Sequence, residues 1–133
     1  LRQTLTGLYH ACPEETSYRN LLLAFRETFP EWQVQKEQLL VYWLYTYFCG
    51  AVYDERIFAK GKMAVLCTLF IEELVLGLFV ERQEALAFED LVSVSYRFSR
   101  ELEHSDQNLN TLEELLEHEG IFSLEYLLTL CEI

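Results

Sequence analysis

The sequence predicts an all-α protein, an orthogonal bundle of about five to seven helices. Of its 133 residues, 51% are hydrophobic and 14% are aromatic, which is enough for a sizeable core. Only five glycines and two prolines occur, and this favours long regular elements over a turn-rich β fold. The length suits one domain, so we expect residues 1–133 to form a single helical domain. Because the chain starts at Leu1, we also expect it to be part of a longer protein.

Prolines and a polar cap delimit the first two helices. Residues 1–11 fit a short helix that ends before Pro13. Ser17 is a suitable N-cap for a second helix through Thr28, in which apolar residues recur at helical spacing. The Phe29–Pro30 pair ends this helix, since the residue before a proline avoids the α region.

A third helix is expected from about residue 31 to Cys49. Nearly every residue from 39 to 48 is apolar, and a helix that is apolar all round is typically buried. Gly50 is the expected stop, and Asp54 could cap a following turn. The aromatic residues of this region either belong to the core or line a ligand cavity; they are Tyr42, Trp43, Tyr45, Tyr47, Phe48 and Tyr53.

Residues 62–82 form a strongly apolar segment that is about as long as the ~20 residues of a membrane span. Glu72 and Glu73 lie at its centre, where each acidic residue would cost roughly 2.5–3.5 kcal/mol on insertion. We therefore expect the central core helix of a soluble bundle. The two carboxylates point in different directions, so one should pair with Arg or Lys and the other should face solvent. The alternative is a buried carboxylate with a raised pKa that acts as an acid or base.

The last helices carry caps and a lopsided charge. We expect helices at residues 88–104, at 111–117 with a Thr111–Glu114 capping box and an end at Gly120, and at 124–131 with Ser123 as cap. The net charge is −12, and no Lys or Arg follows Arg100. This excludes nucleic acid and anionic membranes as expected partners. The acidic segment is either a solvated face or a patch that attracts a basic partner.

No metal or redox motif is visible. The four cysteines include no CxxC pair, and the three histidines are scattered, so we expect no metal site. Unpaired cysteines favour a reduced, cytoplasmic setting. Near the end of the fourth helix, the charged side chains form either an exposed ladder or the wall of a polar pocket; they are Arg97, Arg100, Glu101, Glu103 and His104.

Two groups of short motifs resemble a known family. The first is Tyr18-Arg19-Asn20 with Phe25-Arg26 and Phe29-Pro30; the second is Tyr96, Phe98-Ser99-Arg100 and Glu103-His104. In order and spacing, residues 17–105 resemble the C-terminal helical part of the flagellin lysine-N-methylase family. The resemblance implies a C-terminal fragment of an enzyme that transfers methyl groups from S-adenosylmethionine to lysine side chains of flagellin.

The resemblance also implies site residues and a departure. The family's polar positions correspond to Arg19, Asn20, Arg26, Arg100, Glu103 and His104, and together with Arg97 these form the expected ligand-facing network. The family's N-terminal cysteine cluster has no counterpart here, so we expect catalysis to need sequence outside this fragment. The partner would be a basic or lysine-bearing protein such as flagellin.

Two other functions remain compatible with the composition. The chain could be the effector-binding or dimerisation domain of a transcriptional regulator of the tetracycline-repressor type, since such domains are helical and aromatic-rich. It could also be a protein-interaction bundle without chemistry.

Overall fold

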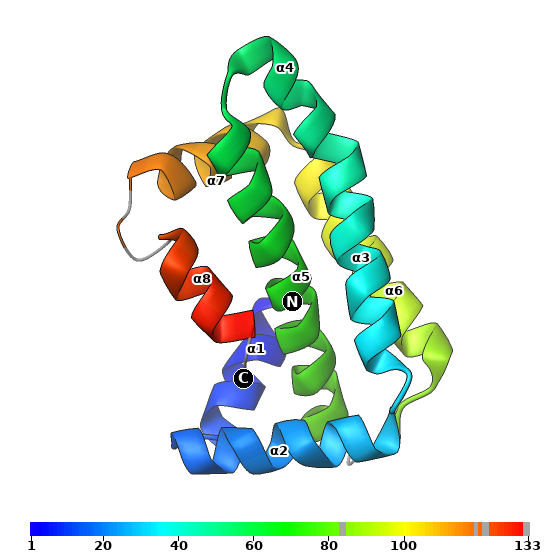
Figure 1. Ribbon diagram of the computed structural model, residues 1–133. Coiled ribbons are helices and arrows are strands. Elements are labelled where there is room, and N and C mark those ends of the chain that lie inside the picture. Colours follow the sequence, from blue (N-terminus) through cyan, green and yellow to red (C-terminus); the bar gives the residue numbers. More distant parts are fainter. Residues whose placement is uncertain (83–84, 119, 121–122, 132–133) are drawn as a thin grey trace.

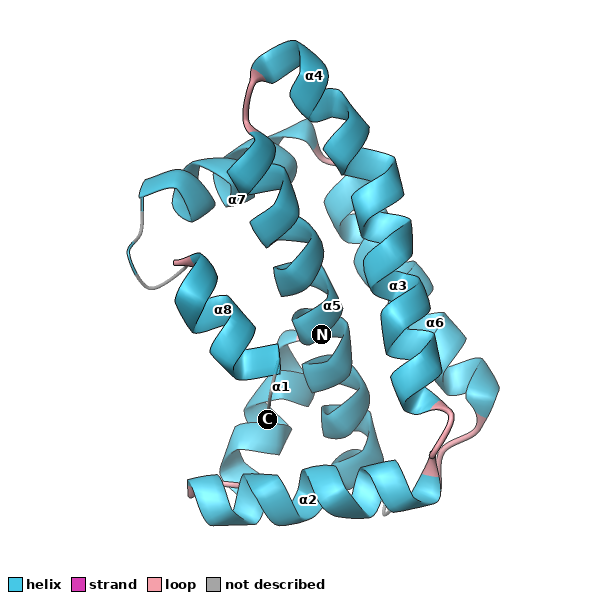
Figure 2. Cartoon of the chain, in the orientation of Figure 1, coloured by secondary structure: helices cyan, strands magenta, loops and turns pink. Residues whose placement is uncertain are grey.

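The computed structural model describes residues 1–82, 85–118, 120 and 123–131, and over these residues it consists of helices joined by short loops (Figures 1 and 2). The all-α class is confirmed. In chain order the elements are α1 (Arg2–Ala11), α2 (Glu15–Thr28), α3 (Trp32–Tyr47), the 3-10 turn η1 (Phe48–Gly50), α4 (Ala51–Asp54), α5 (Ile57–Glu81), α6 (Phe88–Glu103), α7 (Asp106–His118) and α8 (Leu124–Cys131).

Helix α5 is the central element, as the apolar run predicted. It runs through the middle of the bundle and contacts α1, α2, α3, α6, α7 and α8 (Figure 1). Among the described helices, α5 alone is long and apolar enough to cross a membrane, but 67% of its most apolar 18-residue window is buried. This packing is typical of the core helix of a soluble protein.

Helix α1 lies close against α5 because of a glycine. A Cβ atom added at Gly77 would approach both Cγ2 and the backbone oxygen of Thr4 to 2.8 Å. One turn further along α1, Leu8 is fully buried in the core. Gly77 therefore sets how closely the first helix can approach the central one.

Several helix starts differ from those predicted. Helix α2 begins at Glu15, two residues before Ser17, and has no side-chain cap. Helix α7 begins at Asp106, which places Thr111 inside the helix, and the hydroxyl of Ser105 caps it by accepting the N–H of Asn108 at 3.2 Å. Helix α5 also starts earlier than predicted, at Ile57. Only α7 gains a side-chain cap by its earlier start, whereas α2 and α5 begin without one.

Two other expectations concern the helix ends. The Ser123 cap is confirmed, since the Ser123 hydroxyl accepts the N–H of Tyr126 at 3.3 Å. Gly50 does not stop the chain's helical course, because η1 continues into α4, and the chain turns instead at Glu55 with a left-handed φ of 60°. Helix α7 ends at His118, two residues before Gly120.

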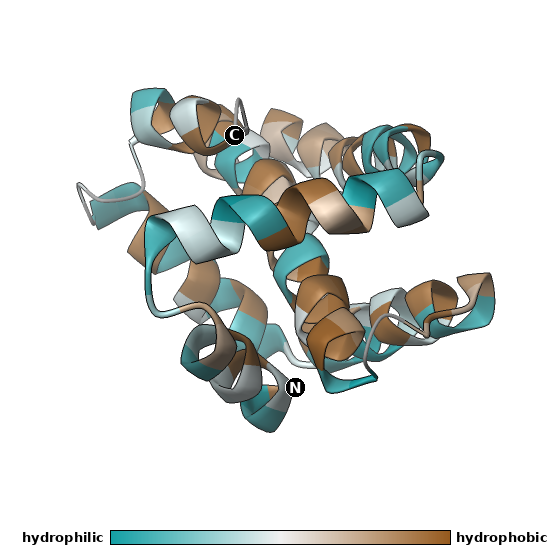
Figure 3. Cartoon of the chain, turned by 90° about the horizontal axis from the view of Figure 1, so that it is seen from below, coloured by the Kyte–Doolittle hydropathy of each residue, from teal (hydrophilic) through white to brown (hydrophobic). Residues whose placement is uncertain are grey.

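The expectation that α3 is buried all round is wrong. Only Trp32 and Trp43 of this helix are buried, whereas the side chain of Tyr45 is 78% exposed and that of Val41 is 47% exposed. Helix α3 lies on the outside of the bundle and packs one face on α5 (Figure 1). Seen from the α2 end, the outer helices carry hydrophobic and hydrophilic stripes (Figure 3). The apolar residues of α3 that do not pack on α5 therefore remain accessible at the surface.

Candidate functional site

An open groove of about 380 Å³ lies between α3 and α6, with Ile71 of α5 among its lining residues. A side of α3 that does not pack on α5 supplies one wall of this groove. On α6, the lining residues recur at spacings of three and four and so share one side of the helix. We call this feature the α3–α6 groove; its walls are Trp32, Gln35, Gln38, Leu39, Tyr42 and Trp43 of α3, and Phe88, Leu91, Val92, Ser95, Tyr96 and Ser99 of α6.

The walls of the α3–α6 groove are aromatic and uncharged. Both tryptophans of the chain line it. The ring of Trp43 stacks on Tyr47 at a centroid distance of 5.6 Å and meets Phe98 edge-on at 6.0 Å. The Trp43 N–H is buried and has no acceptor among the described residues. The site therefore combines rigid aromatic surface with a few uncharged hydrogen-bonding groups, as ligand sites commonly do.

A carboxylate stands at the end of this groove. Glu103, one turn beyond Ser99 on α6, accepts hydrogen bonds from the hydroxyls of Tyr42, at 2.8 Å, and of Ser99. Glu103 is half-buried, and in the part of the chain that the structure describes no Lys, Arg or His forms an ion pair with it. Together with burial, the charge of Glu103 raises the pKa of Tyr47 and brings the pKa of Cys67 to about 12.

The carboxylate of Glu72 is neutralised inside the core. It accepts the indole N–H of Trp32 at 2.7 Å and the ammonium of Lys36 at 2.7 Å. The Glu72 side chain is 6% exposed and that of Lys36 is 14% exposed. The expected pairing of one carboxylate with a lysine is confirmed, and this pair holds the first half of α3 on α5.

The neighbouring carboxylate does not face solvent, and that prediction is wrong. Glu73 is half-buried and accepts hydrogen bonds from the hydroxyls of Tyr18 and Tyr9, the latter at 3.3 Å. Burial raises the pKa of Glu73, while the two phenol hydrogen bonds oppose the rise. Burial and the bond to Glu73 together raise the pKa of Tyr18. This cluster joins α1 and α2 to α5.

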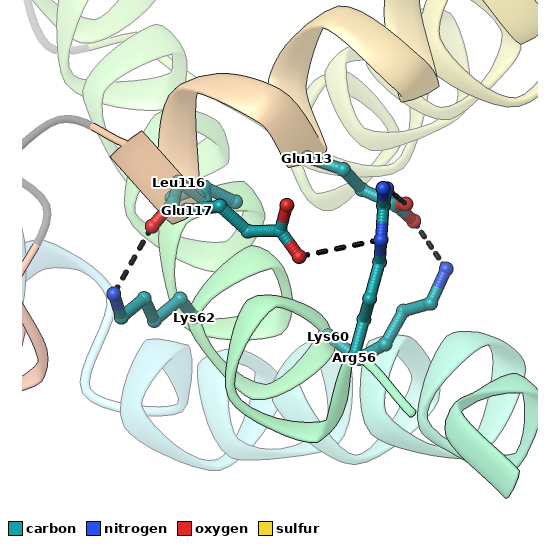
Figure 4. Close-up of polar contacts among 6 residues, drawn as sticks. All are labelled: Arg56, Lys60, Lys62, Glu113, Leu116 and Glu117. Carbon is teal, nitrogen blue, oxygen red and sulfur yellow. Dashed lines mark hydrogen bonds and ion pairs between the residues drawn. The ribbon is translucent and has the colours of Figure 1, made fainter. Parts of the chain in front are cut away.

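A third charged cluster fastens α7 to the start of α5 (Figure 4). Glu113 is buried and pairs with Lys60 and with Arg56, whose guanidinium also lies 3.3 Å from Glu117. Lys62 donates to the backbone oxygen of Leu116 at 3.0 Å. Arg56 and Lys60, at the start of α5, thus pair with acidic side chains of α7. This part of the acidic C-terminal segment therefore helps to pack the two helices together.

The comparisons with known proteins identify the family. Residues 1–130 match the family model described as the FliB lysine N-methylase C-terminal domain. The chain belongs to this family of flagellin lysine N-methylase C-terminal domains. No curated protein and no solved structure gives a significant match.

The methylase domain distributes the predicted ligand-facing network over two distant places. Arg19, Asn20 and Arg26 lie on α2, which runs across one end of the molecule, whereas the C-terminal end of α6 points toward the other end (Figure 1). The Arg19 guanidinium is exposed and pairs with Glu15 of its own helix at 2.8 Å. Of the network, Glu103 is the member whose hydrogen-bond partners line the α3–α6 groove.

The remaining α6 residues of the network are exposed. Arg97 and Arg100 lie on the surface of α6, and His104 follows the last turn of this helix. No ion pair joins Arg97 to Glu101 among the described contacts, so the expected ladder is not formed there. In the described part of the methylase domain, no three His, Cys, Asp or Glu residues converge as metal ligands.

Sequence reasoning missed most of the groove's α6 wall. Phe88, Val92 and Tyr96 carry an apolar stripe of their own, offset from the buried stripe that begins at Leu91. A helix with two apolar stripes has one more than its core contact needs. This second apolar stripe is the sequence signal from which the α6 wall of the groove could have been predicted.

Proposed function

We propose that this domain takes part in the methylation of flagellin by binding the lysine-bearing polypeptide along the α3–α6 groove. The family match supports the enzyme and its substrate. The groove supports the binding role, because it is a concave, mostly apolar and aromatic surface that is open to solvent. The family match favours this function over the regulator and the non-catalytic bundle.

The shape and chemistry of the groove suit a polypeptide. Its walls offer aromatic area for apolar side chains, and Gln35, Gln38 and Ser95 can exchange hydrogen bonds with a peptide backbone. The net charge of −12 attracts a basic segment and raises the rate of encounter. The opening to solvent allows a bound chain to enter and leave along its length.

The methyl donor does not fit the groove. S-adenosylmethionine supplies the methyl group in such a reaction, and its amino-acid portion carries a carboxylate that needs a cationic or N–H-rich partner. The groove is lined by uncharged residues, and the described residues contain no strand from which a nucleotide-binding βαβ unit could be built. We therefore propose that the donor and the catalytic groups lie in a part of the methylase outside this domain. We also propose that the enzyme acts in the cytoplasm.

A charge placed in the groove tests the proposal. Val92 lines the groove with a side chain that is 51% exposed, so Val92→Arg should fold. In the full-length methylase with S-adenosylmethionine and purified flagellin, we expect the KM for flagellin to rise by roughly tenfold or more, since 1.4 kcal/mol of lost binding gives that factor. The measurement is transfer of labelled methyl groups at varied flagellin concentrations.

A matched control separates the groove from general surface effects. Val41 of α3 is 47% exposed and does not line the groove, so Val41→Arg adds the same charge elsewhere on the same pair of helices. This variant should keep the wild-type KM. Normal methylation kinetics in Val92→Arg would rule out the groove as the substrate site.

A further inference from the structure

Among the residues that the structure describes, four glutamates are buried or half-buried, and their carboxylates have two different kinds of partner. Glu72 and Glu113 each pair with a lysine. Glu73 and Glu103 instead accept hydrogen bonds from hydroxyl groups, and neither has an ion-pair partner among the described residues. A carboxylate withdrawn from solvent normally has a cationic partner. A cation supplied by a ligand would therefore bind most favourably at these two positions.

Only one of these two carboxylates adjoins the α3–α6 groove. Glu103 accepts hydrogen bonds from Tyr42 and Ser99, which both line the groove, and a hydrogen bond with Glu103 also helps to raise the pKa of Tyr47 behind them. The partners of Glu73 are Tyr9 and Tyr18, which are not among its lining residues. The groove thus adjoins a carboxylate that forms no ion pair with any described residue.

We propose that Glu103, with Tyr42 and Ser99, forms a subsite that receives the ammonium group of a lysine side chain of the bound polypeptide; this rests on the proposed function. Tyr42 donates to Oε1 and Ser99 to Oε2. A carboxylate accepts about four hydrogen bonds, so Glu103 keeps capacity for an N–H of the ligand even with its bond to Tyr47 counted. The two hydroxyls fix the orientation of the carboxylate without consuming its charge.

The adjoining surface suits the rest of a lysine side chain. The apolar stem of a lysine packs against hydrophobic surface while its charged head seeks a polar group. The ring of Tyr42 is partly exposed and packs edge-on against the buried Trp43 at a centroid distance of 5.4 Å, and aromatic faces attract ammonium groups. No Lys or Arg lines the groove to repel the ligand. An anionic ligand would be repelled by Glu103.

The test compares two peptides that differ by one acetyl group. A flagellin peptide with one lysine, and the same peptide with N-acetyl-lysine, are titrated into this chain while tryptophan fluorescence is recorded. Both tryptophans line the groove, so the signal reports on this site. We expect the lysine peptide to bind roughly tenfold more tightly, because acetylation removes the charge and keeps the stem.

Glu103→Gln tests the subsite directly. We expect the ratio of the two affinities to fall to about one, with the affinity for the acetylated peptide unchanged. Glu101→Gln removes an exposed charge two residues away, outside the groove, and should keep the wild-type ratio. If Glu103→Gln does not fold, as judged by circular dichroism, the wild-type comparison and Tyr42→Phe, which removes one orienting hydroxyl, carry the test.

The outcomes distinguish this proposal from the function on which it rests. Equal binding of both peptides to the wild type would overturn the lysine subsite and leave the groove as a polypeptide site. Discrimination that survives Glu103→Gln would place the lysine elsewhere. If neither peptide binds and Val92→Arg methylates flagellin normally, the proposed function itself fails.

Discussion

At the scale of single residues, Glu72 and Glu73 show how neighbours acquire different environments. Successive residues of a helix point about 100° apart, so one carboxylate faces α3 and the other faces α1 and α2. Lys36 of α3 meets the first, whereas two tyrosines meet the second. The sequence showed that the two could not share a site, but which partner each one finds depends on the packing of distant helices.

The raised pKa of Glu73 predicts a pH dependence of stability. Its pKa exceeds the ordinary value of 4.5 in the folded domain, so between the two pKa values the folded state binds more protons than the unfolded state. The free energy of unfolding should therefore fall as pH rises from about 4.5 through the folded-state pKa, and this contribution is fully lost above it.

Glu73→Gln should remove this contribution while keeping an acceptor for the two tyrosines. Urea denaturation at a series of pH values, from 4.5 to neutral, measures the difference between wild type and variant. We expect the variant to gain relative stability as pH rises. Parallel curves for the two proteins would contradict the prediction, and Glu37→Gln, an exposed change on α3, should give such parallel curves.

At the scale of elements, apolar periodicity predicted where helices occur better than where they start or what they bury. Ser17 and Thr111 look like caps, yet both lie inside longer helices. A residue that could cap a helix competes with polar residues upstream of it for the position at which the helix starts. Tertiary packing decides which of these positions the helix uses. The apolar run of α3 similarly indicated burial, whereas Tyr42 instead borders, half exposed, a groove that the packing of α6 creates.

The contact between α1 and α5 gives a prediction at this scale. Gly77→Ala places a Cβ 2.8 Å from Thr4 atoms that include a backbone oxygen, so α1 must shift, at a cost of about 1–3 kcal/mol. Gly61→Ala in the same helix meets open space and should instead stabilise the domain by up to about 1 kcal/mol. Denaturant unfolding measures both. Equal effects of the two changes would contradict this description of the helix contact.

At the scale of the whole molecule, the helical class followed from composition, and the family followed from short motifs in α2 and α6. The sequence predicted only part of the candidate site. Glu103 was singled out through the resemblance and lies beside the groove, but Arg19 and Asn20 were singled out with it and lie on α2, away from the C-terminal end of α6. A motif records which residues a family shares, and it does not separate those that pack helices from those that meet a ligand.

The cofactor prediction belongs to this scale because it concerns what the domain as a whole offers. We expect calorimetric titration of S-adenosylmethionine into this chain to show no binding, since the groove has no cation for the donor's carboxylate. Heat of binding that Arg100→Ala or His104→Ala abolishes would contradict this, and would place the donor at the end of α6.

The ion pairs and hydrogen bonds of the lysines have a consequence for an enzyme that methylates lysine. The chain has three lysines, Lys36, Lys60 and Lys62, and each donates its ammonium to a partner: Glu72, Glu113 and the backbone oxygen of Leu116. Methyl transfer uses the lone pair of a neutral amine, so we expect these three lysines to be poor methyl acceptors while the domain is folded. The same contacts hold α3 and α7 against α5.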